Sequence, residues 1–135
     1  MYDKGQGVVQ NYAEALRWYR LAADQGQASA QANLGVMYGY GQGVVQNYAE
    51  ALRWFSLAAD QGHAIAQADL GVMYAKGQGV AWDLISAHMW LNIAAASGNK
   101  TAERFRDIVA KGMTPTDISK AQKLAREWME KHQAQ

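Results

Sequence analysis

The chain has 135 residues, a length typical of one domain, and half of its residues are hydrophobic. Its 13 basic and 12 acidic residues are interspersed and give a formal net charge of +1, which argues against nucleic acid as a partner. Cysteine is absent, which excludes disulfides and thiolate metal sites, and no apolar run approaches the length needed for membrane insertion.

The chain contains an internal repeat. Residues 5–26 recur 36 residues later with changes at only two positions, where Phe55 replaces Tyr19 and Ser56 replaces Arg20. A period in the twenties to fifties is typical of stacked repeats, in which each unit buries its apolar face on its neighbours. The repeat therefore predicts a solenoid.

The first half of each repeat has the pattern of an amphipathic helix. Asn11 and Asn47 are each followed three residues later by glutamate, Glu14 and Glu50, which resembles a capping box. Apolar residues then recur at helical spacing, and Trp18 lies at the edge of this face. In the first copy the face consists of Tyr12, Ala15, Leu16, Tyr19, Ala22 and Ala23. The glycines where a left-handed helix stop is expected are Gly26 and Gly62.

A second helix is expected from about residue 28 to residue 38. The residues predicted to face inward are Ala30, Leu34, Met37 and Tyr38. Gly35 and Gly71 lie inside these helices, where glycine costs about 1 kcal/mol relative to alanine. We therefore expect another helix to approach closely at each glycine. The glycines of 39–43 and 77–79 then turn the chain toward the next repeat.

The third repeat diverges, and the chain ends in a different kind of helix. Asp83 takes the capping position, and the second half of the repeat loses Leu-Gly, so Phe105, Ile108 and Val109 are expected to supply its apolar face. Thr114-Pro115 opens a last helix, as cap and first helical residue. Its apolar face is Ile118, Ala121, Leu124, Ala125 and Trp128, and its polar face is Lys120, Lys123, Glu127, Glu130 and Lys131. Such a helix is suited to closing a solenoid against water.

Together these elements predict one all-α domain over residues 1–135. Residues 1–4 are the tail of a preceding unit, the repeats cover about 5–40, 41–76 and 77–112, and a capping helix covers about 114–132. Met1-Tyr2 aligns with positions late in the later repeats, so we expect the chain to be a fragment of a longer array. If a signal peptide lies upstream, the protein is expected in the periplasm or outside the cell. Without one, it is expected in the bacterial cytoplasm.

The repeat resembles the Sel-1-like repeat family, a bacterial branch of the tetratricopeptide-like solenoids. The resemblance covers about residues 2–102, and the pattern is carried in the first copy by Ala15, Trp18, Tyr19, Ala22, Ala23, Gly26, Ala30, Leu34, Gly35, Tyr38, Gly41, Gly43 and Val44. The resemblance implies a right-handed α/α superhelix whose first helices line a concave, protein-binding groove. It also implies an adaptor function. The cysteines that join each repeat in one branch of the family are missing here, so the penicillin-binding activity suggested for that branch finds no support in this sequence.

The sequence gives little indication of catalysis, a cofactor or a metal. His63, His88 and His132 fall in different units without ligand spacing, and His63 is interpreted as a solvated loop residue. The Gly-x-Gly steps lack the context of a phosphate-binding loop and are interpreted as turns. Glu14 and Glu50 each have an arginine three residues on, which indicates surface ion pairs rather than paired catalytic carboxylates. The tryptophans at positions 18, 54 and 90 are interpreted as core.

The remaining candidate site is the outward stripe of the first helices, which we call the first-helix stripe. It consists of Glu14, Arg17, Arg20 and Asp24, then Glu50, Arg53, Ser56 and Asp60, then Ser86, Met89, Asn92 and Ala96. The stripe changes from charged to nearly neutral along the array. It suits a peptide with an acidic and an apolar end, and the alternative is an ordinary solvated face.

Three functions follow from the sequence. The first is a non-catalytic scaffold that binds a protein or peptide in the groove. The second is a structural segment of a longer repeat protein, or a homodimer, that associates through the N-terminal end around Tyr2, Val8 and Val9. The third, a β-lactam-binding or hydrolysing protein, rests only on the distant family association.

Overall fold

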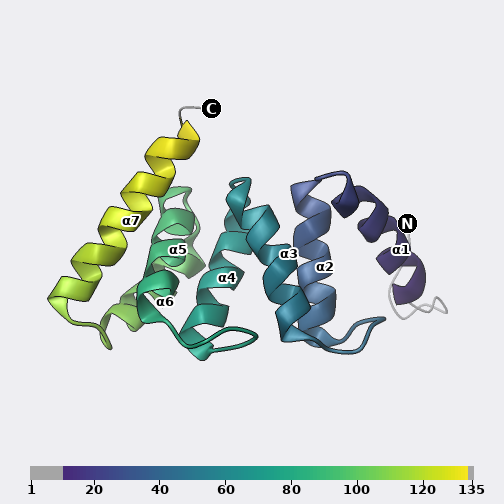
Figure 1. The fold of residues 1–135 in the computed structure, drawn as a ribbon, viewed down its shortest axis with the longest axis horizontal. Helices are drawn as coiled ribbons and strands as arrows, with labels where there is room; N and C mark the ends of the chain where they lie inside the picture. The colour runs from purple at the N-terminus through teal and green to yellow at the C-terminus, as the bar shows by residue number, and fades with distance from the viewer. Residues whose placement is uncertain (1–10, 134–135) are drawn as a thin grey trace.

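The computed structural model describes residues 11–133, which form seven α-helices in a row from α1 at one end to α7 at the other (Figure 1). The helices are α1 (Tyr12–Asp24), α2 (Ala28–Tyr40), α3 (Tyr48–Asp60), α4 (Ala64–Lys76), α5 (Leu84–Ala96), α6 (Lys100–Ala110) and α7 (Pro115–Gln133). The first six form three helix pairs that start at intervals of 36 residues, as the repeat predicts. The expected all-α solenoid is confirmed. The second helices extend two residues beyond the expected end, to Tyr40 in the first repeat.

Side-chain caps define where the first helices begin. The side chains of Asn11, Asn47 and Asp83 each accept a hydrogen bond from the backbone N–H three residues on, at 2.9 to 3.1 Å. Thr114 caps α7 in the same way, and Pro115 is its first residue. These bonds satisfy amide groups that the first turn of a helix leaves without partners. The predicted caps are confirmed.

His63 lies between α3 and α4 and is half-buried, and it has a more specific role than the solvated loop residue that the sequence suggested. His63 is the N-cap of α4, and its Nδ1 accepts a hydrogen bond from the backbone N–H of Ala66 at 3.2 Å. Asn99 caps α6 at the equivalent position, with a bond of 2.8 Å from the N–H of Ala102. His63 therefore has a structural role.

The second helices of the first two repeats, α2 and α4, pack closely on the first helix of the next repeat at a glycine. A methyl group added at Gly35 would lie 2.6 Å from the ring of Phe55, and one added at Gly71 would lie 2.7 Å from Leu91. Helix α2 lies against α3, and α4 lies against α5. The contact at each glycine is so close that no side chain larger than hydrogen fits there. The close approach expected at both glycines is confirmed.

The Gly-x-Gly steps are turns, as predicted. Gly41, Gly43, Gly77 and Gly79 all have φ between 70° and 75°, a range that favours glycine. Gly79 also passes the start of α3, where an added methyl would lie 2.6 Å from the carbonyl oxygen of Tyr48. The first such step, Gly5-x-Gly7, lies outside the described residues.

Buried glutamines join the two helices of a repeat. Gln31 and Gln67 donate from Nε2 to the carbonyl oxygens of Ala23 and Ala59, at 3.3 and 3.1 Å. These carbonyls belong to the last turn of a first helix, and each also accepts a hydrogen bond from the backbone N–H of the glycine three residues on, Gly26 or Gly62. Gln61 of the second repeat donates in turn to Oε1 of Gln31 at 2.8 Å, so the network also crosses between repeats.

The second half of the third repeat differs from what we expected. Val109 is buried, but Phe105 and Ile108 are exposed, so the prediction that all three supply an apolar face was wrong. Ala102 and Val109 form the buried face of α6. They are seven residues, about two helical turns, apart, and this register turns Phe105 and Ile108 toward solvent.

The last helix packs mainly on α5 rather than on α6. Its buried residues, Ala121 and Ala125, lie on the predicted apolar face, and Trp128 contacts Trp90 edge to face with ring centroids 5.7 Å apart. The lysines and glutamates of the predicted polar face are all exposed. A capping helix is thus confirmed, but it folds back along α5.

The tryptophans of the three repeats differ in burial. Trp54 is 4% exposed and packs with Ala23, Ala30 and Leu34 of the preceding repeat, whereas Trp18 is 59% exposed. The expectation of a core residue therefore holds for Trp54 but not for Trp18. Trp90 is half-buried and contacts Trp128 of α7, which follows it in the chain.

We expect Gly35→Ala to destabilise the protein by about 1 to 3 kcal/mol, because the new methyl would overlap the buried ring of Phe55. Gly39→Ala in the same helix is the matched control, since the nearest atom to its added methyl is 3.9 Å away. That substitution should instead stabilise the helix by up to about 1 kcal/mol. Urea unfolding measures both, and a stabilising Gly35→Ala would contradict the close packing.

Candidate protein-binding surfaces

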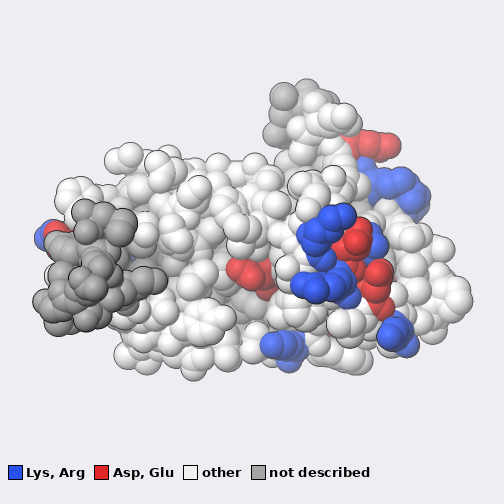
Figure 2. Space-filling view, turned by 180° about the vertical axis from the view of Figure 1, so that it is seen from behind, with Lys and Arg blue, Asp and Glu red and all other residues white. Residues whose placement is uncertain are grey.

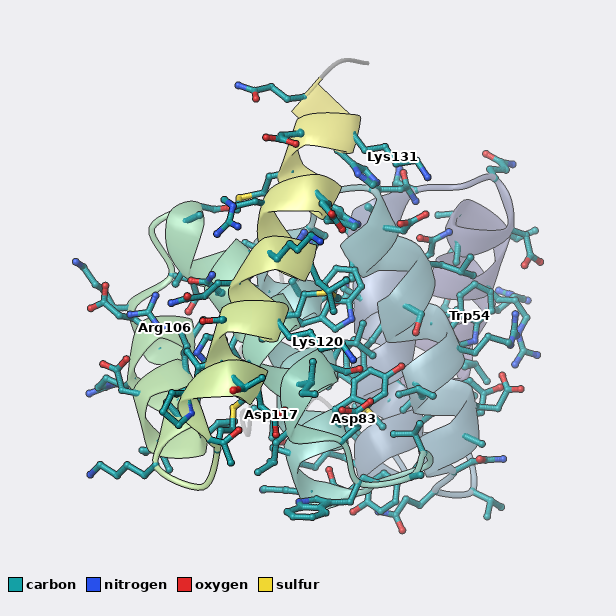
Figure 3. The ribbon with its side chains drawn as sticks, turned by 60° about the vertical axis from the view of Figure 1, so that its left-hand side comes forward. Trp54, Asp83, Arg106, Asp117, Lys120 and Lys131 are labelled. Atoms are coloured by element: carbon teal, nitrogen blue, oxygen red, sulfur yellow. The ribbon has the colours of Figure 1, made fainter. Side chains whose placement is uncertain are left out.

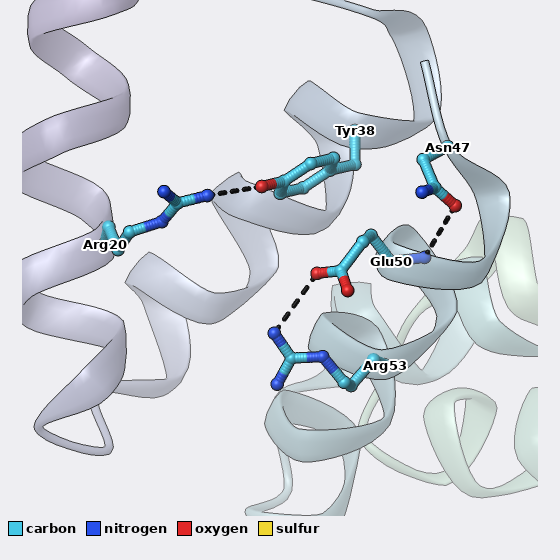
Figure 4. Close-up of polar contacts among 5 residues, drawn as sticks. All are labelled: Arg20, Tyr38, Asn47, Glu50 and Arg53. Carbon is cyan, nitrogen blue, oxygen red and sulfur yellow. Dashed lines mark hydrogen bonds and ion pairs between the residues drawn. The ribbon is translucent and has the colours of Figure 1, made fainter. Parts of the chain in front are cut away.

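The charged part of the first-helix stripe is held together by intrahelical ion pairs. Arg53 and Glu50 lie 3.1 Å apart, and Arg17 and Glu14 lie 3.9 Å apart, as the spacing predicted. The Arg53 pair is drawn in Figure 4. Such exposed pairs contribute only a few tenths of a kcal/mol to helix stability. Their charges therefore remain available to a partner at little cost in stability.

Each of these arginines also lies near the tryptophan that follows it. The guanidinium carbon of Arg53 is 4.4 Å from the ring centroid of Trp54, and that of Arg17 is 5.8 Å from the ring of Trp18. A cation over an aromatic face is attracted by the ring, which limits the orientations available to the arginine. Arginine and tryptophan are also the residue types that dominate binding energy at protein interfaces.

The positions that break the strict copy have local partners. Arg20 donates to the hydroxyl of Tyr38 on α2, so its side chain is directed along the repeat (Figure 4). Ser56, at the equivalent position, donates within its own helix to the carbonyl of Leu52 at 2.7 Å.

The predicted stripe residues Asn92 and Met89 of the third repeat are partly enclosed. Asn92 accepts a hydrogen bond from Arg106 at 3.0 Å. Met89 is half-buried.

The stripe contains exposed leucines that the sequence analysis did not identify. Leu21 lies between Arg17 and Asp24 and is 52% exposed, and Leu57 at the equivalent position in α3 is 43% exposed. Their spacing, four residues after the arginine, is the signal that would have found them, because such residues share one helix face.

The equivalent residue of the third repeat is buried. Ile93 is only 2% exposed, and α7 packs on its helix, α5. No described helix packs in this way on α1 or α3. The described helices therefore leave Leu21 and Leu57 exposed, whereas α7 packs on the helix that carries the equivalent Ile93.

The C-terminal part of α7 reaches the end of the stripe on α3. Nε2 of His132 lies 3.5 Å from a carboxylate oxygen of Asp60, and its ring stacks on Trp128 with centroids 3.7 Å apart. Nδ1 of His132 also lies 2.8 Å from the carbonyl oxygen of Trp128. These contacts fix α7 next to the open part of the stripe.

The start of α7 is held near the start of α5. Burial acts to raise the pKa of Asp83, but hydrogen bonds from Ser86 and the charge of Lys120 lower it below its usual value. Lys120 extends from α7 toward this carboxylate (Figure 3). With Trp128 against Trp90 further along, α7 contacts α5 at two separate places.

A second candidate surface lies on the other side of α3. A hollow of about 390 Å³ is lined by α2, α3, α4 and the two loops that follow α2 and α4. Its residues are Gly35, Val36, Gly39, Tyr40, Gln46, Tyr48, Ala51, Phe55, Asp69, Val72, Met73, Lys76 and Gln78. This volume is in the range of small-ligand pockets. The sequence analysis did not identify this hollow.

Asp69 is the one acidic residue that lines the hollow. Burial among these mostly uncharged groups raises the pKa of its carboxyl to about 6. Within residues 11–133, no lysine, arginine or histidine nitrogen lies within 4 Å of this carboxyl to form an ion pair. An ionised carboxylate in such a place reduces stability unless a cation offsets its desolvation.

The described residues contain no group of three or more histidine, cysteine or acidic side chains arranged to hold a metal. His88 is buried, and burial, followed by the charge of Arg106, lowers its pKa against the opposing effect of Asp107. Within residues 11–133, no helix is both long and apolar enough to span a bilayer.

The row of helix pairs, which start at intervals of 36 residues, shows that this chain is a helical repeat protein. The Sel1 repeat model matches residues 1–27, 28–63, 64–99 and 111–131. The chain therefore belongs to the Sel1 repeat family, whose members are generally non-catalytic scaffolds for protein–protein interaction.

Two solved structures support this assignment. The protective antigen c5321 of uropathogenic Escherichia coli, which displays an SLR fold, is 33% identical, with a TM-score of 0.89 over 94% of this chain and 27% of the antigen. The chain therefore spans about a quarter of that protein. The Sel1 repeat protein from Oxalobacter formigenes is 44% identical, with a TM-score of 0.69 over 76% of this chain and 77% of that one. Comparison with curated proteins gives no match.

We expect Asp69→Asn to stabilise the protein near pH 7.5 by about 1 to 2 kcal/mol, less than the full pKa shift implies because solvent reaches part of the carboxyl. The raised pKa means that the native state binds more protons than the unfolded state between about pH 4 and pH 6. The native carboxyl therefore lowers stability as the pH rises through this window.

Urea unfolding of both proteins across this pH range measures the effect. The difference between them should be near zero at about pH 4 and reach its full value above about pH 6. A difference that does not change with pH would show that the native carboxyl titrates normally.

Proposed function

We propose that the chain binds a protein or peptide partner along the first-helix stripe of α1 and α3. The observation that carries the proposal is that Ile93 is buried on α5, the helix on which α7 packs, while the equivalent Leu21 and Leu57 remain exposed. The protein's own third repeat thus provides an example of a helix docked on a first helix. The partner would present apolar side chains to these leucines.

The charges beside the leucines suit a partner with acidic residues as well. Arg17 and Arg53 lie four residues before Leu21 and Leu57, and both are well exposed. An acidic group of the partner would interact with an arginine that its neighbouring tryptophan already orients. Such charges contribute mainly to association rate and to the choice of partner. We therefore expect a partner helix or peptide with an apolar face and an acidic edge.

The test begins with a selection of displayed peptides on the immobilised wild-type chain, followed by affinity measurements on the peptides obtained. A first variant, Leu21→Ser with Leu57→Ser, removes the apolar contacts, and a second, Arg17→Glu with Arg53→Glu, reverses the charges. The matched control is Arg104→Glu with Lys111→Glu, which makes the same change in net charge at exposed positions on and just after α6.

Each stripe variant should weaken binding by about tenfold or more, and the control should change it little. Isothermal titration calorimetry measures the affinities, and circular dichroism verifies that each variant is folded. If the selected peptides bind all four proteins equally, the stripe is not the binding site.

The exposure of Trp18 favours a second function, in which the face of α1 that carries Trp18 associates with further repeats or with another copy of the chain. In the second repeat the equivalent Trp54 is buried against the unit before it. Molar mass measured over a range of concentrations separates the two functions. A dimer that Trp18→Ala disrupts supports association through this face, and a monomer at all concentrations leaves the stripe as the binding surface.

A further inference from the structure

The hollow described above is separate from the first-helix stripe. Tyr48, Ala51 and Phe55 of α3 line it, whereas Glu50 and Arg53 belong to the stripe. At 100° per residue these two sets lie on opposite faces of α3. A ligand in the hollow would therefore contact the second helices, α2 and α4, and leave the stripe open.

The surroundings of the hollow are nearly free of charge. Helix α2 has no acidic or basic residue, and α4 has only Asp69 and Lys76. Figure 2 shows a face of the molecule on which charged side chains gather toward the C-terminal end, while most of the remaining surface is uncharged. Asp69 and Lys76 are thus the two charged residues that line the hollow, among apolar, tyrosine, glycine and glutamine residues.

The walls of the hollow suit an alkyl chain, and its rim suits a cation. Val36, Val72 and Met73 provide apolar contacts for methylene groups. Tyr40 and Tyr48 line it as well and are exposed, so their ring faces are accessible to a positive charge. Gly39 of α2 leaves space in the hollow, since the atom nearest to an added methyl is the methyl of Ala51 at 3.9 Å.

These features select among ligands. An anion would meet the Asp69 carboxylate, and a purely apolar ligand would leave that carboxylate buried without a partner, which is costly. A lysine or arginine side chain provides both an apolar stem and a terminal positive charge. The hollow extends over three helices and is larger than one such side chain, so an apolar neighbour of the same ligand would fill the rest.

We propose that this hollow binds a peptide segment of a partner in which an arginine or lysine, next to an apolar residue, pairs with Asp69. The ion pair with the partner's cation offsets the loss of hydration of the Asp69 carboxylate in the hollow. Lys76 lies two helical turns further along α4, at the same hollow, and its like charge weakens the binding of any cation. The site does not depend on the stripe of the proposed function, so either can fail without the other.

The probe is the amidated peptide acetyl-Gly-Leu-Arg-Leu-Gly, titrated into the ¹⁵N-labelled chain near neutral pH and followed by amide chemical shifts. A second peptide has citrulline, a neutral isostere, in place of arginine, and a third has lysine. Acetylarginine amide alone distinguishes a peptide site from a site for a free small cation. The protein variants are Asp69→Asn, Lys76→Gln and the control Asp24→Asn, which removes an exposed carboxylate on α1.

The arginine peptide should bind saturably and shift the amides of Val36, Gly39 and Val72. Its affinity should fall about tenfold or more with citrulline or with Asp69→Asn, rise with Lys76→Gln, and stay unchanged with Asp24→Asn. Acetylarginine amide should bind more weakly than the peptide, because the apolar part of the hollow stays unfilled.

Three results would show that the hollow is not the site, and a fourth would show that its ligand is not a peptide. The first is the lack of saturable binding of both the arginine and the lysine peptide. The second is equal affinity for the wild-type protein and Asp69→Asn, and the third is a set of shifted amides on α1 and the outer face of α3. If acetylarginine amide binds as tightly as the peptide, the site takes free organic cations and the assignment to a peptide is wrong.

Discussion

The close approach of helices at Gly35 and Gly71 determines how the repeats stack. Each glycine leaves room for a large side chain, Phe55 or Leu91, from the first helix of the next repeat. Because the contact recurs after 36 residues, at Gly35 and at Gly71, one local constraint sets the spacing of the three repeats. The caps and the glutamine network then define the ends of helices whose positions the glycines have set.

The array changes where this constraint is lost. At the positions equivalent to Leu70 and Gly71, the third repeat has Arg106 and Asp107, so no glycine is available to admit another helix. Arg106 instead donates to Asn92 on α5, and Asp107 is exposed. The next helix, α7, packs on α5, the helix that carries the buried Ile93. Leu21 on α1 and Leu57 on α3 remain exposed.

The two candidate surfaces differ in what they contribute to stability. The stripe carries exposed ion pairs, which stabilise the helices only slightly, and exposed leucines, which gain little until a partner covers them. The hollow contains a carboxylate whose burial opposes folding when it is ionised. In both places the residues concerned add little to the stability of the free chain, and a partner of the right chemistry would improve their environment.

The sequence by itself determined the repeat length, the helix pairs, the caps and the glycine contacts, because these depend on neighbours at short or periodic spacing. It also identified Arg17 and Arg53 as part of an outward stripe, for the same reason. Only the tertiary structure decided which of these outward positions are open, since the direction of α7 depends on packing between distant segments. The hollow around Asp69 likewise arises from three helices whose residues share no local pattern, so burial of its carboxyl is a property of the assembled fold.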